Sequence, residues 1–197
     1  MPKKGIMGGT FDPIHHGHLV AAEEVRDFFH LEEVVFVPSA RPPHKLNQHI
    51  SDPIHRHLMC VLATISNPHF IVSSVEIERK GQSYSIETIR YFKKQWGGKT
   101  EIFFIAGADA FSQISTWNNS SSLLEVCTFV VTTRPGFMFS SLSDQFRENV
   151  KTIEVSALAI SSSEIRRRVS RKETIKYLLP EAVEDYIYKN GLYCEVR

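Results

Sequence analysis

Glycine and histidine side chains gather near the N-terminus in the run Gly8-Gly9-Thr10-Phe11-Asp12-Pro13-Ile14-His15-His16-Gly17-His18. Gly8 and Gly9 can adopt positive φ and let the backbone come close to a ligand. His15 and His18 lie three residues apart at the entry to an expected helix, so their imidazoles would project toward one spot and donate to phosphate oxygens. The helix start near Gly17 would add unpaired N–H groups and the positive end of the helix dipole. This segment predicts a phosphate-binding turn.

Other interpretations of the same segment are weaker. Paired histidines can bind zinc, yet no Glu stands between them as a general base and no third ligand is obvious, so we expect no protein-bound metal. The G-x-G-x-x-G pattern and the Gly-Lys-Ser or Gly-Lys-Thr of a P-loop are both missing, which argues against a dehydrogenase and a P-loop kinase. Histidines at helical spacing are often surface residues, but the preceding glycine turn favours a ligand site.

A second candidate segment lies near the C-terminus and reads Ile160-Ser161-Ser162-Ser163-Glu164-Ile165-Arg166. Serines at a helix start offer hydroxyl and N–H donors to a phosphate, and Arg166 can add a forked cation. A simpler interpretation is a serine N-cap followed by solvated arginines at 166–168. Taken alone, the segment favours that simpler interpretation.

The elements that would position both segments alternate between strands and helices. Apolar, β-branched runs predict strands at 4–7, 33–37, 70–77, 101–106, 127–132 and 152–155. Helical spacing predicts a helix from Leu19 to Phe29 and another around Ile187, closed by Gly191. This alternation predicts the α/β class, with a Rossmann-like, doubly wound parallel sheet and helices on both faces, in one domain over residues 1–197. Ligands of such sheets bind beyond the carboxyl ends of the strands.

Composition narrows the class of protein further. Among 197 residues, 23 Lys and Arg nearly balance 22 Asp and Glu, and no basic stripe with aromatics appears, so we expect no nucleic-acid partner. Cys60, Cys127 and Cys194 form no C-x-x-C pattern and are interpreted as buried thiols of a reducing compartment. The N-terminal apolar stretch is too short for a signal peptide or a membrane span, so we expect a cytoplasmic protein without a membrane partner.

Together, the two segments resemble the nucleotidyltransferase superfamily marked by H-x-G-H. Its first motif, G-(T/S)-F-D-x-x-H-x-G-H, stands here from Gly9 to His18, and its second, (I/V)-S-S-T-x-I-R, from Ile160 to Arg166 with Ser163 for Thr. The resemblance implies catalytic roles for His15, His18 and Arg166. It implies ATP binding by residues of both motifs and of one further turn: Gly8, Gly9, Thr10, Phe11, His15, Gly17, His18, Gly107, Asp109, Ile160, Ser161, Ser162, Ser163, Ile165 and Arg166.

Further segments are similar to one branch of that superfamily, the bacterial nicotinate-nucleotide adenylyltransferases, over essentially the whole chain. They are Pro42-Pro43-His44-Lys45, Ser83-Tyr84-Ser85-Ile86-Glu87-Thr88, Gly107-Ala108-Asp109, Thr116-Trp117, Arg134-Pro135-Gly136 and Asn190-Gly191-Leu192-Tyr193. The resemblance implies nicotinate mononucleotide as the acceptor, bound by His44, Lys45, Tyr84, Ser85, Thr88, Trp117 and Arg134. The cationic members of this set would suit phosphate groups.

Three residues have specific expected roles. The ring of Trp117 would stack on the nicotinate, although core packing is the usual role of a lone Trp. The hydroxyl of Ser85 and the N–H groups of its helix start would receive the nicotinate carboxylate, with simple helix capping as the alternative. Asp109 would accept hydrogen bonds from a ribose, with N-capping as the alternative.

The implied reaction is transfer of AMP from ATP to nicotinate mononucleotide, giving nicotinate adenine dinucleotide and pyrophosphate in NAD biosynthesis. The acceptor phosphate is already ionised at pH 7, so alignment and charge neutralisation suffice and no general base is needed. Mg²⁺ would arrive with ATP. The alternatives are an adenylyltransferase for nicotinamide mononucleotide or phosphopantetheine, a metal-dependent hydrolase and a non-catalytic nucleotide sensor. Whether the chain forms a homo-oligomer is left open.

Overall fold

The computed structural model describes residues 1–42, 50–111, 114, 117, 120–133, 150–156 and 158–194, with only the backbone of Asp109, Ser120 and Ser121. Within these residues, six parallel strands form one sheet in the order β3-β2-β1-β4-β5-β6. The strands are β1 Lys3–Gly9, β2 Glu33–Pro38, β3 Phe70–Val72, β4 Glu101–Gly107, β5 Thr128–Thr133 and β6 Val150–Glu154. This order confirms the predicted Rossmann-like α/β class.

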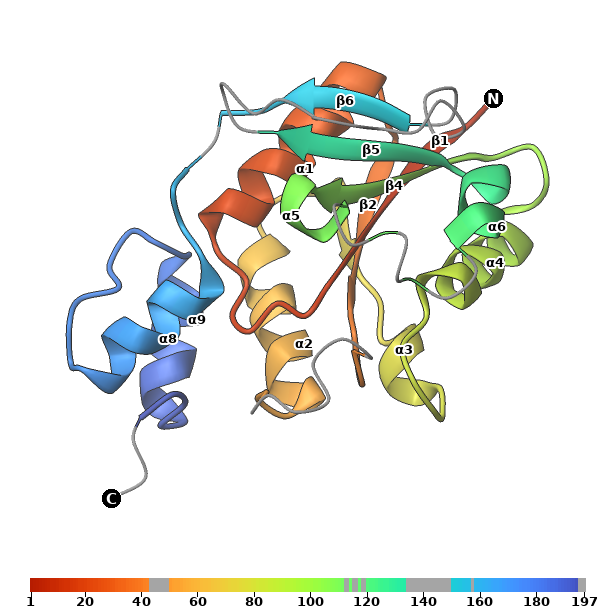
Figure 1. Ribbon diagram of the computed structural model, residues 1–197. Coiled ribbons are helices and arrows are strands. Elements are labelled where there is room, and N and C mark those ends of the chain that lie inside the picture. Colours follow the sequence, from red (N-terminus) through yellow and green to blue (C-terminus); the bar gives the residue numbers. More distant parts are fainter. Residues whose placement is uncertain are drawn as a thin grey trace.

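Helices cover both faces of the sheet (Figure 1). They are α1 His16–Phe29, α2 Pro53–Thr64, α3 Val75–Glu78, α4 Ser85–Trp96, α5 Ala108–Phe111, α6 Ser120–Val126, α8 Ser162–Ser170 and α9 Glu181–Lys189. One apolar core packs α1, α2, α8 and α9 against one face, and a second packs α4, α5 and α6 against the other. Figure 1 shows α8 and α9 together at one end of the molecule, and α9 also contacts α2.

Alternate residues of the central strands enter opposite cores. In β1, Met7 faces the α1 side whereas Ile6 faces the α4 side, and in β4 Phe103 and Phe104 divide in the same way. Because both faces are covered, neighbouring positions are apolar along the whole strand rather than alternating with polar ones. This explains why continuous apolar runs predicted most strands correctly.

The strand order changes direction between β1 and β4, whose residues pair from Lys3 with Glu101 to Met7 with Ile105. At such a switch point the connections after the two strands leave toward opposite faces, which opens a crevice at the carboxyl ends. The turn that leads from β1 into α1 and the segment that follows β4 therefore border the place where a ligand is expected.

One predicted strand is wrong in its second half. The run 70–77 forms a strand only at Phe70–Val72, and α3 begins at Val75. The hydroxyl of Ser73 accepts the N–H of Val75 at 3.3 Å, so the chain turns into a helix although the following residues are β-branched. The C-terminal cap was predicted correctly, because Gly191 adopts φ of 59° and the N–H of Leu192 donates to the carbonyl of Ile187.

The cysteines follow the prediction in part. Cys60 and Cys127 are buried free thiols, and burial raises the pKa of Cys127 to about 12. Cys194 is exposed, which contradicts its interpretation as a buried thiol. It lies beyond the last helix, where no further element covers it in the described part of the chain. Among the described residues, no helix is both long and apolar enough to cross a bilayer.

Candidate active site

A cavity of about 520 Å³ opens at the carboxyl ends of β1, β2 and β4. The turn after β1 forms one side, the start of α4 forms another, and the segment after β4 completes the wall. Its lining includes these predicted site residues: Gly8, Gly9, Thr10, Phe11, His18, Tyr84, Ser85, Gly107 and Trp117. Residues of the predicted ATP set and of the predicted acceptor set therefore line one cavity beyond the strand ends, where the sequence predicts the ligand site.

Gly8 and Gly9 do not supply the positive φ that the sequence predicts for them. Gly8 and Gly9 end β1, and the positive φ of the turn belongs to Phe11, at 50°. A Cβ on Gly9 would lie 2.8 Å from Cζ of Phe11, and one on Gly8 would lie 3.1 Å from Cζ of Phe104. The prediction of positive φ at these glycines is thus wrong. They are needed for space, because aromatic rings pack against the backbone here.

His15 and His18 come together as predicted. Their ring centroids lie 3.8 Å apart, with 31° between the ring planes. His15 is the N-cap residue of α1, and Gly17 leaves room for its ring, since a Cβ there would lie 3.1 Å from His15 Nδ1. The N–H of His16 donates to the carbonyl of Leu178 at 3.1 Å. The helix start therefore offers fewer unpaired N–H groups than the sequence predicted.

The hydrogen bonding of His18 selects one form of its ring. The backbone N–H of His15 donates to Nδ1 of His18 at 3.2 Å, so this nitrogen acts as an acceptor and the neutral ring carries its proton on Nε2. Desolvation by burial, and then the charge of His15, hold the pKa of His18 well below its ordinary value. At neutral pH, His18 thus presents a neutral N–H donor at the cavity wall.

The second motif contacts the first one. The hydroxyl of Ser162 donates to the carbonyl of Pro13 at 2.8 Å, and Nη1 of Arg166 donates to the carbonyl of Asp12 at 2.7 Å. Gly17, at the start of α1, lies close both to the ring of His15 and to the carbonyl of Ile160. The two motifs, nearly 150 residues apart in the chain, therefore build one structure around the turn.

Parts of the second motif also follow the simpler interpretation. Ser161 is the N-cap of α8 and accepts the N–H of Glu164 at 3.2 Å, while Ile165 is fully buried in the core. Arg167 and Arg168 pair with Glu164. Ser161 also hydrogen-bonds the exposed Ser163 at 3.1 Å, and none of the residues 160–166 belongs to the cavity lining. Arg166 alone of the three arginines turns to the first motif.

Two of the predicted acceptor-binding residues, Tyr84 and Ser85, lie at the start of α4. Ser83, Tyr84 and Ser85 line the cavity, and the N-cap residue Tyr84 makes no side-chain cap bond. Thr88 is buried away from the cavity lining, and its hydroxyl donates to Glu76 at 2.5 Å. Glu76 itself lines the cavity and was not among the predicted site residues. Thr88 therefore contacts Glu76 rather than the cavity itself.

Trp117 lies between the apolar core and the cavity. Its ring packs edge-on against Phe104 and Phe129, with centroid distances of 6.2 and 6.1 Å, and it also lines the cavity. A ring held by core residues on one side and open on another can offer a stacking surface at little cost in side-chain entropy. His44, Lys45, Arg134 and the side chain of Asp109 lie outside the described residues.

Sequence reasoning missed a buried polar network beneath the turn. Arg56 is fully buried, and Asp12 is only 4% exposed. The hydroxyl of Tyr193 donates to Asp12 at 2.8 Å. A signal for Arg56 was present, because it shares the apolar face of its helix with Met59 and Cys60, three and four residues further on.

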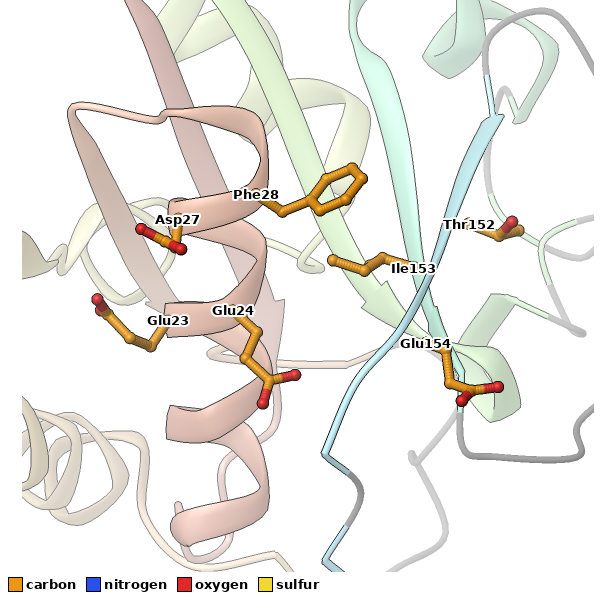
Figure 2. A pocket seen from close by; sticks show the side chains of 7 residues that line it. All are labelled: Glu23, Glu24, Asp27, Phe28, Thr152, Ile153 and Glu154. Atoms are coloured by element: carbon orange, nitrogen blue, oxygen red, sulfur yellow. The ribbon is translucent and has the colours of Figure 1, made fainter.

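A second hollow lies between α1 and β6 (Figure 2). It is lined by Glu23, Glu24, Asp27, Phe28, Thr152, Ile153 and Glu154, none of them a predicted site residue. Figure 2 shows Phe28 and Ile153 pointing toward each other across the gap. Its carboxylates are already engaged in part, since Glu23 binds Arg26 and Asn67 and Glu24 accepts the N–H of Ser156. The cavity beside His18 is therefore the candidate active site.

The fold, the joined motifs and the cavity define a Rossmann-like nucleotidyltransferase. In agreement with this class, residues 6–168 match the cytidylyltransferase-like family. Relatives that match nearly the full length of the chain identify the family within this class. A protein of Thermoanaerobacter sp. (strain X514), named a probable nicotinate-nucleotide adenylyltransferase, is 51% identical over 196 residues, which cover 96% of this chain and 93% of the relative. The chain belongs to the nicotinate-nucleotide adenylyltransferase family.

Two further comparisons agree. A protein of the same name from Moorella thermoacetica is 50% identical over 196 residues, covering 96% of this chain and 90% of the relative. The solved structure of a nicotinic acid mononucleotide adenylyltransferase from Plasmodium falciparum, complexed with NaAD, has a TM-score of 0.79 at 20% identity and covers 98% of both chains. The second likeness concerns the fold alone.

Proposed function

We infer that this chain transfers AMP from ATP to nicotinate mononucleotide and so makes nicotinate adenine dinucleotide and pyrophosphate in NAD biosynthesis. The observation that carries this inference is the identity of about half of all residues with nicotinate-nucleotide adenylyltransferases over 96% of the chain. The cavity supports it, because it brings a phosphate-binding turn and an aromatic, hydroxyl-lined wall to one place.

In the proposed complex, ATP lies against the turn after β1. Nε2–H of His18 donates to a phosphate oxygen, and His15, which adjoins it at 3.8 Å between ring centroids, supports the same group. A neutral donor needs no proton loss before the reaction and gains strength as negative charge grows on the phosphate oxygens. Arg166 keeps the turn in place and provides a cation beside the leaving pyrophosphate.

The acceptor lies against the start of α4. The nicotinate ring stacks on Trp117, and its carboxylate receives the hydroxyl of Ser85 and the first N–H groups of the helix. The amide of nicotinamide would match these donors poorly, because its NH2 group is itself a donor and would face the hydroxyl or N–H groups that a carboxylate oxygen accepts. His44, Lys45 and Arg134 supply positive charge to phosphates, and Asp109 binds a ribose.

The reaction is a direct displacement. An oxygen of the ionised acceptor phosphate attacks the α-phosphorus of ATP, the bond from that phosphorus to the bridging oxygen breaks, and pyrophosphate departs with the electron pair. No proton has to be removed from the nucleophile. The side chains of the site therefore align the two phosphates and stabilise the added charge of the transition state, and no covalent intermediate with the protein is formed.

Mg²⁺ fits this site as a companion of ATP. Among the described residues, no group of three or more His, Cys, Asp or Glu side chains is placed to hold a metal ion. The buried carboxylate of Asp12 is already bound by Tyr193 and Ser51. Phosphate oxygens would therefore be the main ligands of Mg²⁺, which would neutralise their charge. A cytoplasmic location and any homo-oligomer remain predictions.

A single assay tests the proposed function. Pyrophosphate release is measured from ATP and Mg²⁺ with nicotinate mononucleotide, nicotinamide mononucleotide or phosphopantetheine as the acceptor. We expect rapid release with nicotinate mononucleotide and formation of an equal amount of nicotinate adenine dinucleotide. Release with phosphopantetheine alone, or ATP binding without pyrophosphate release with any acceptor, would overturn the proposal.

A further inference from the structure

Arg56 is a fully buried cation to which the reaction gives no task. It extends from α2, and burial lowers its pKa, an effect that the nearby charge of Asp12 partly opposes. Burying a charge is strongly unfavourable unless hydrogen bonds and an opposite charge compensate for it. An apolar residue would serve core packing better at this position, so the partners of Arg56 are the informative feature.

Those partners are backbone carbonyls of three separate segments. Nη1 of Arg56 donates to Thr10 in the turn after β1 at 2.7 Å, Nε donates to Ser51 before α2 at 2.9 Å, and Nη2 approaches Ala40 after β2 at 3.4 Å. Thr10 is a wall residue of the cavity, whereas Arg56 itself is not. Arg56 therefore ties the phosphate turn to two neighbouring segments from the interior side.

Asp12 lies at the end of the same turn and joins the network through its side chain. Oδ1 accepts the hydroxyl of Tyr193 at 2.8 Å, and Oδ2 accepts the N–H of Ser51 at 3.3 Å. Desolvation and the charge of Asp12 raise the pKa of Tyr193, so the phenol keeps its proton and remains a donor. The carbonyl of Asp12 is held from another side by Arg166.

We propose that Tyr193, Asp12 and Arg56 are positioning residues, which act through the turn at residues 10–12 to align the phosphate-binding groups of the cavity. This proposal rests on the proposed function. The turn leads directly into His15 and His18, so a shift of its backbone moves those rings. Displacements of about 1 Å can cost as much as roughly 10²-fold in rate. Tyr193 is the member furthest from the turn in sequence, and its bond to Asp12 connects the C-terminal segment to the turn.

The deciding variant is Tyr193→Phe, compared with Tyr186→Phe. Each variant removes one hydroxyl of the C-terminal region that hydrogen-bonds to another part of the chain. The hydroxyl of Tyr186 bonds to His55 of α2 at 2.8 Å, whereas only the hydroxyl of Tyr193 bonds to the turn. We expect Tyr193→Phe to lower kcat by about 5-fold or more with KM for both substrates changed less than about twofold, because alignment is lost only in the transition state. Tyr186→Phe should keep kcat within about twofold.

A purely structural role of Tyr193 would give another result. Both variants would then lose thermal stability and keep their wild-type kcat when assayed well below the midpoint of unfolding. That outcome would overturn the positioning role. If the wild-type protein itself released no pyrophosphate, the proposed function would fail instead, so the two failures are distinguishable.

The route through Asp12 has its own test. In an Asp12→Ala background, the further change Tyr193→Phe should alter kcat by less than about twofold, because the oxygen that accepts the Tyr193 hydroxyl is gone. An undiminished effect of Tyr193→Phe in that background would contradict action through Asp12. Arg56→Lys keeps a buried cation but not the three-way contact, and it should lower kcat by about 10-fold or more.

Discussion

The two sides of the cavity are held in place by different chemistry. On the phosphate side, guanidinium groups bind backbone carbonyls of the turn, with Arg56 at Thr10 and Arg166 at Asp12. On the acceptor side, the carboxyl of Glu76 receives the hydroxyl of Thr88, and the hydroxyl of Ser83 accepts the N–H groups of Ala40 and Arg41 at 2.9 and 3.1 Å.

This difference predicts different responses to pH. Guanidinium groups keep their charge throughout the neutral range, so the phosphate side should be fixed at any working pH. Glu76 can change its charge. Desolvation raises its pKa, and the side-chain hydrogen bonds from Thr88 and Ser83 oppose the shift only in part. The contacts that hold the turn on the proposed phosphate side are thus insensitive to pH, whereas the proposed acceptor side includes, among the described residues, the titratable carboxyl of Glu76.

The largest effect is expected at the phosphate side itself. His18→Ala should lower kcat by about 10² to 10³ without unfolding the protein, the usual effect of removing one preorganised donor. His16→Ala, at the neighbouring position, is the control and should stay within about twofold. Steady-state pyrophosphate release measures both. A loss smaller than about threefold for His18→Ala would refute its role.

The same residue gives a pH test of the phosphate side. Because the pKa of His18 is lowered, its ring stays neutral while pH falls through the ordinary histidine value of about 6.5. We expect kcat to remain flat from pH 8 down to that value. A loss of activity centred near pH 6.5 that His18→Gln abolishes would show that the ring titrates normally.

Arg166→Met should have the next largest effect. It removes a charged donor from the carbonyl of Asp12, an interaction worth about 1.5 to 3 kcal/mol, so kcat/KM should fall roughly 10- to 100-fold. Arg167→Met removes a cation of equal size that binds Glu164 and Glu173 instead, and it should leave kcat/KM nearly unchanged. Equal losses in both variants would mean that general positive charge matters, rather than the contact with the turn.

The sequence predicted the phosphate side better than the residues that support it. His15 and His18 could be paired from their spacing, because helix geometry alone places residues three apart on one side. Arg56 and Tyr193 could not be assigned, since their partners lie 46 and 181 residues away and depend on how α2 and the C-terminal segment pack. Contacts of this kind follow from tertiary structure and leave no local pattern.

Local patterns also misled at two places. The glycines of the turn were expected to supply positive φ, but aromatic packing at Phe11 and Phe104 sets the need for glycine instead. The β-branched residues after Val72 suggested a longer strand, yet the hydroxyl of Ser73 starts a helix there. In both cases the contact of a side chain with the backbone determined the local conformation more strongly than the intrinsic conformational preference of the residues.

Acceptor choice tests the other side of the cavity. Nicotinate mononucleotide should exceed nicotinamide mononucleotide in kcat/KM by at least about tenfold, or 1.4 kcal/mol, because hydroxyl and N–H donors at the start of α4 favour a carboxylate. Equal use of the two acceptors by the wild-type protein would remove the proposed role of Ser85.

The aromatic wall of the same side is tested by Trp117→Ala. This variant should raise KM for both mononucleotides by about tenfold or more and leave KM for ATP unchanged, since stacking contributes roughly 1 to 3 kcal/mol.

The smallest effect should be seen in the stability of Glu76→Gln. A raised pKa means that folded Glu76 binds its proton more tightly than unfolded Glu76 does, so the stability it adds is complete below the ordinary glutamate pKa and is lost as pH rises through the raised value. Gln cannot titrate and keeps an oxygen for the hydroxyl of Thr88. The Tm of Glu76→Gln should therefore rise relative to wild type between pH 5 and pH 8, by roughly 2 to 4 °C for each kcal/mol gained. Glu125→Gln, at an exposed position, controls for the lost negative charge. A Tm difference that stays constant over this range would show that both sides of the cavity are equally indifferent to pH.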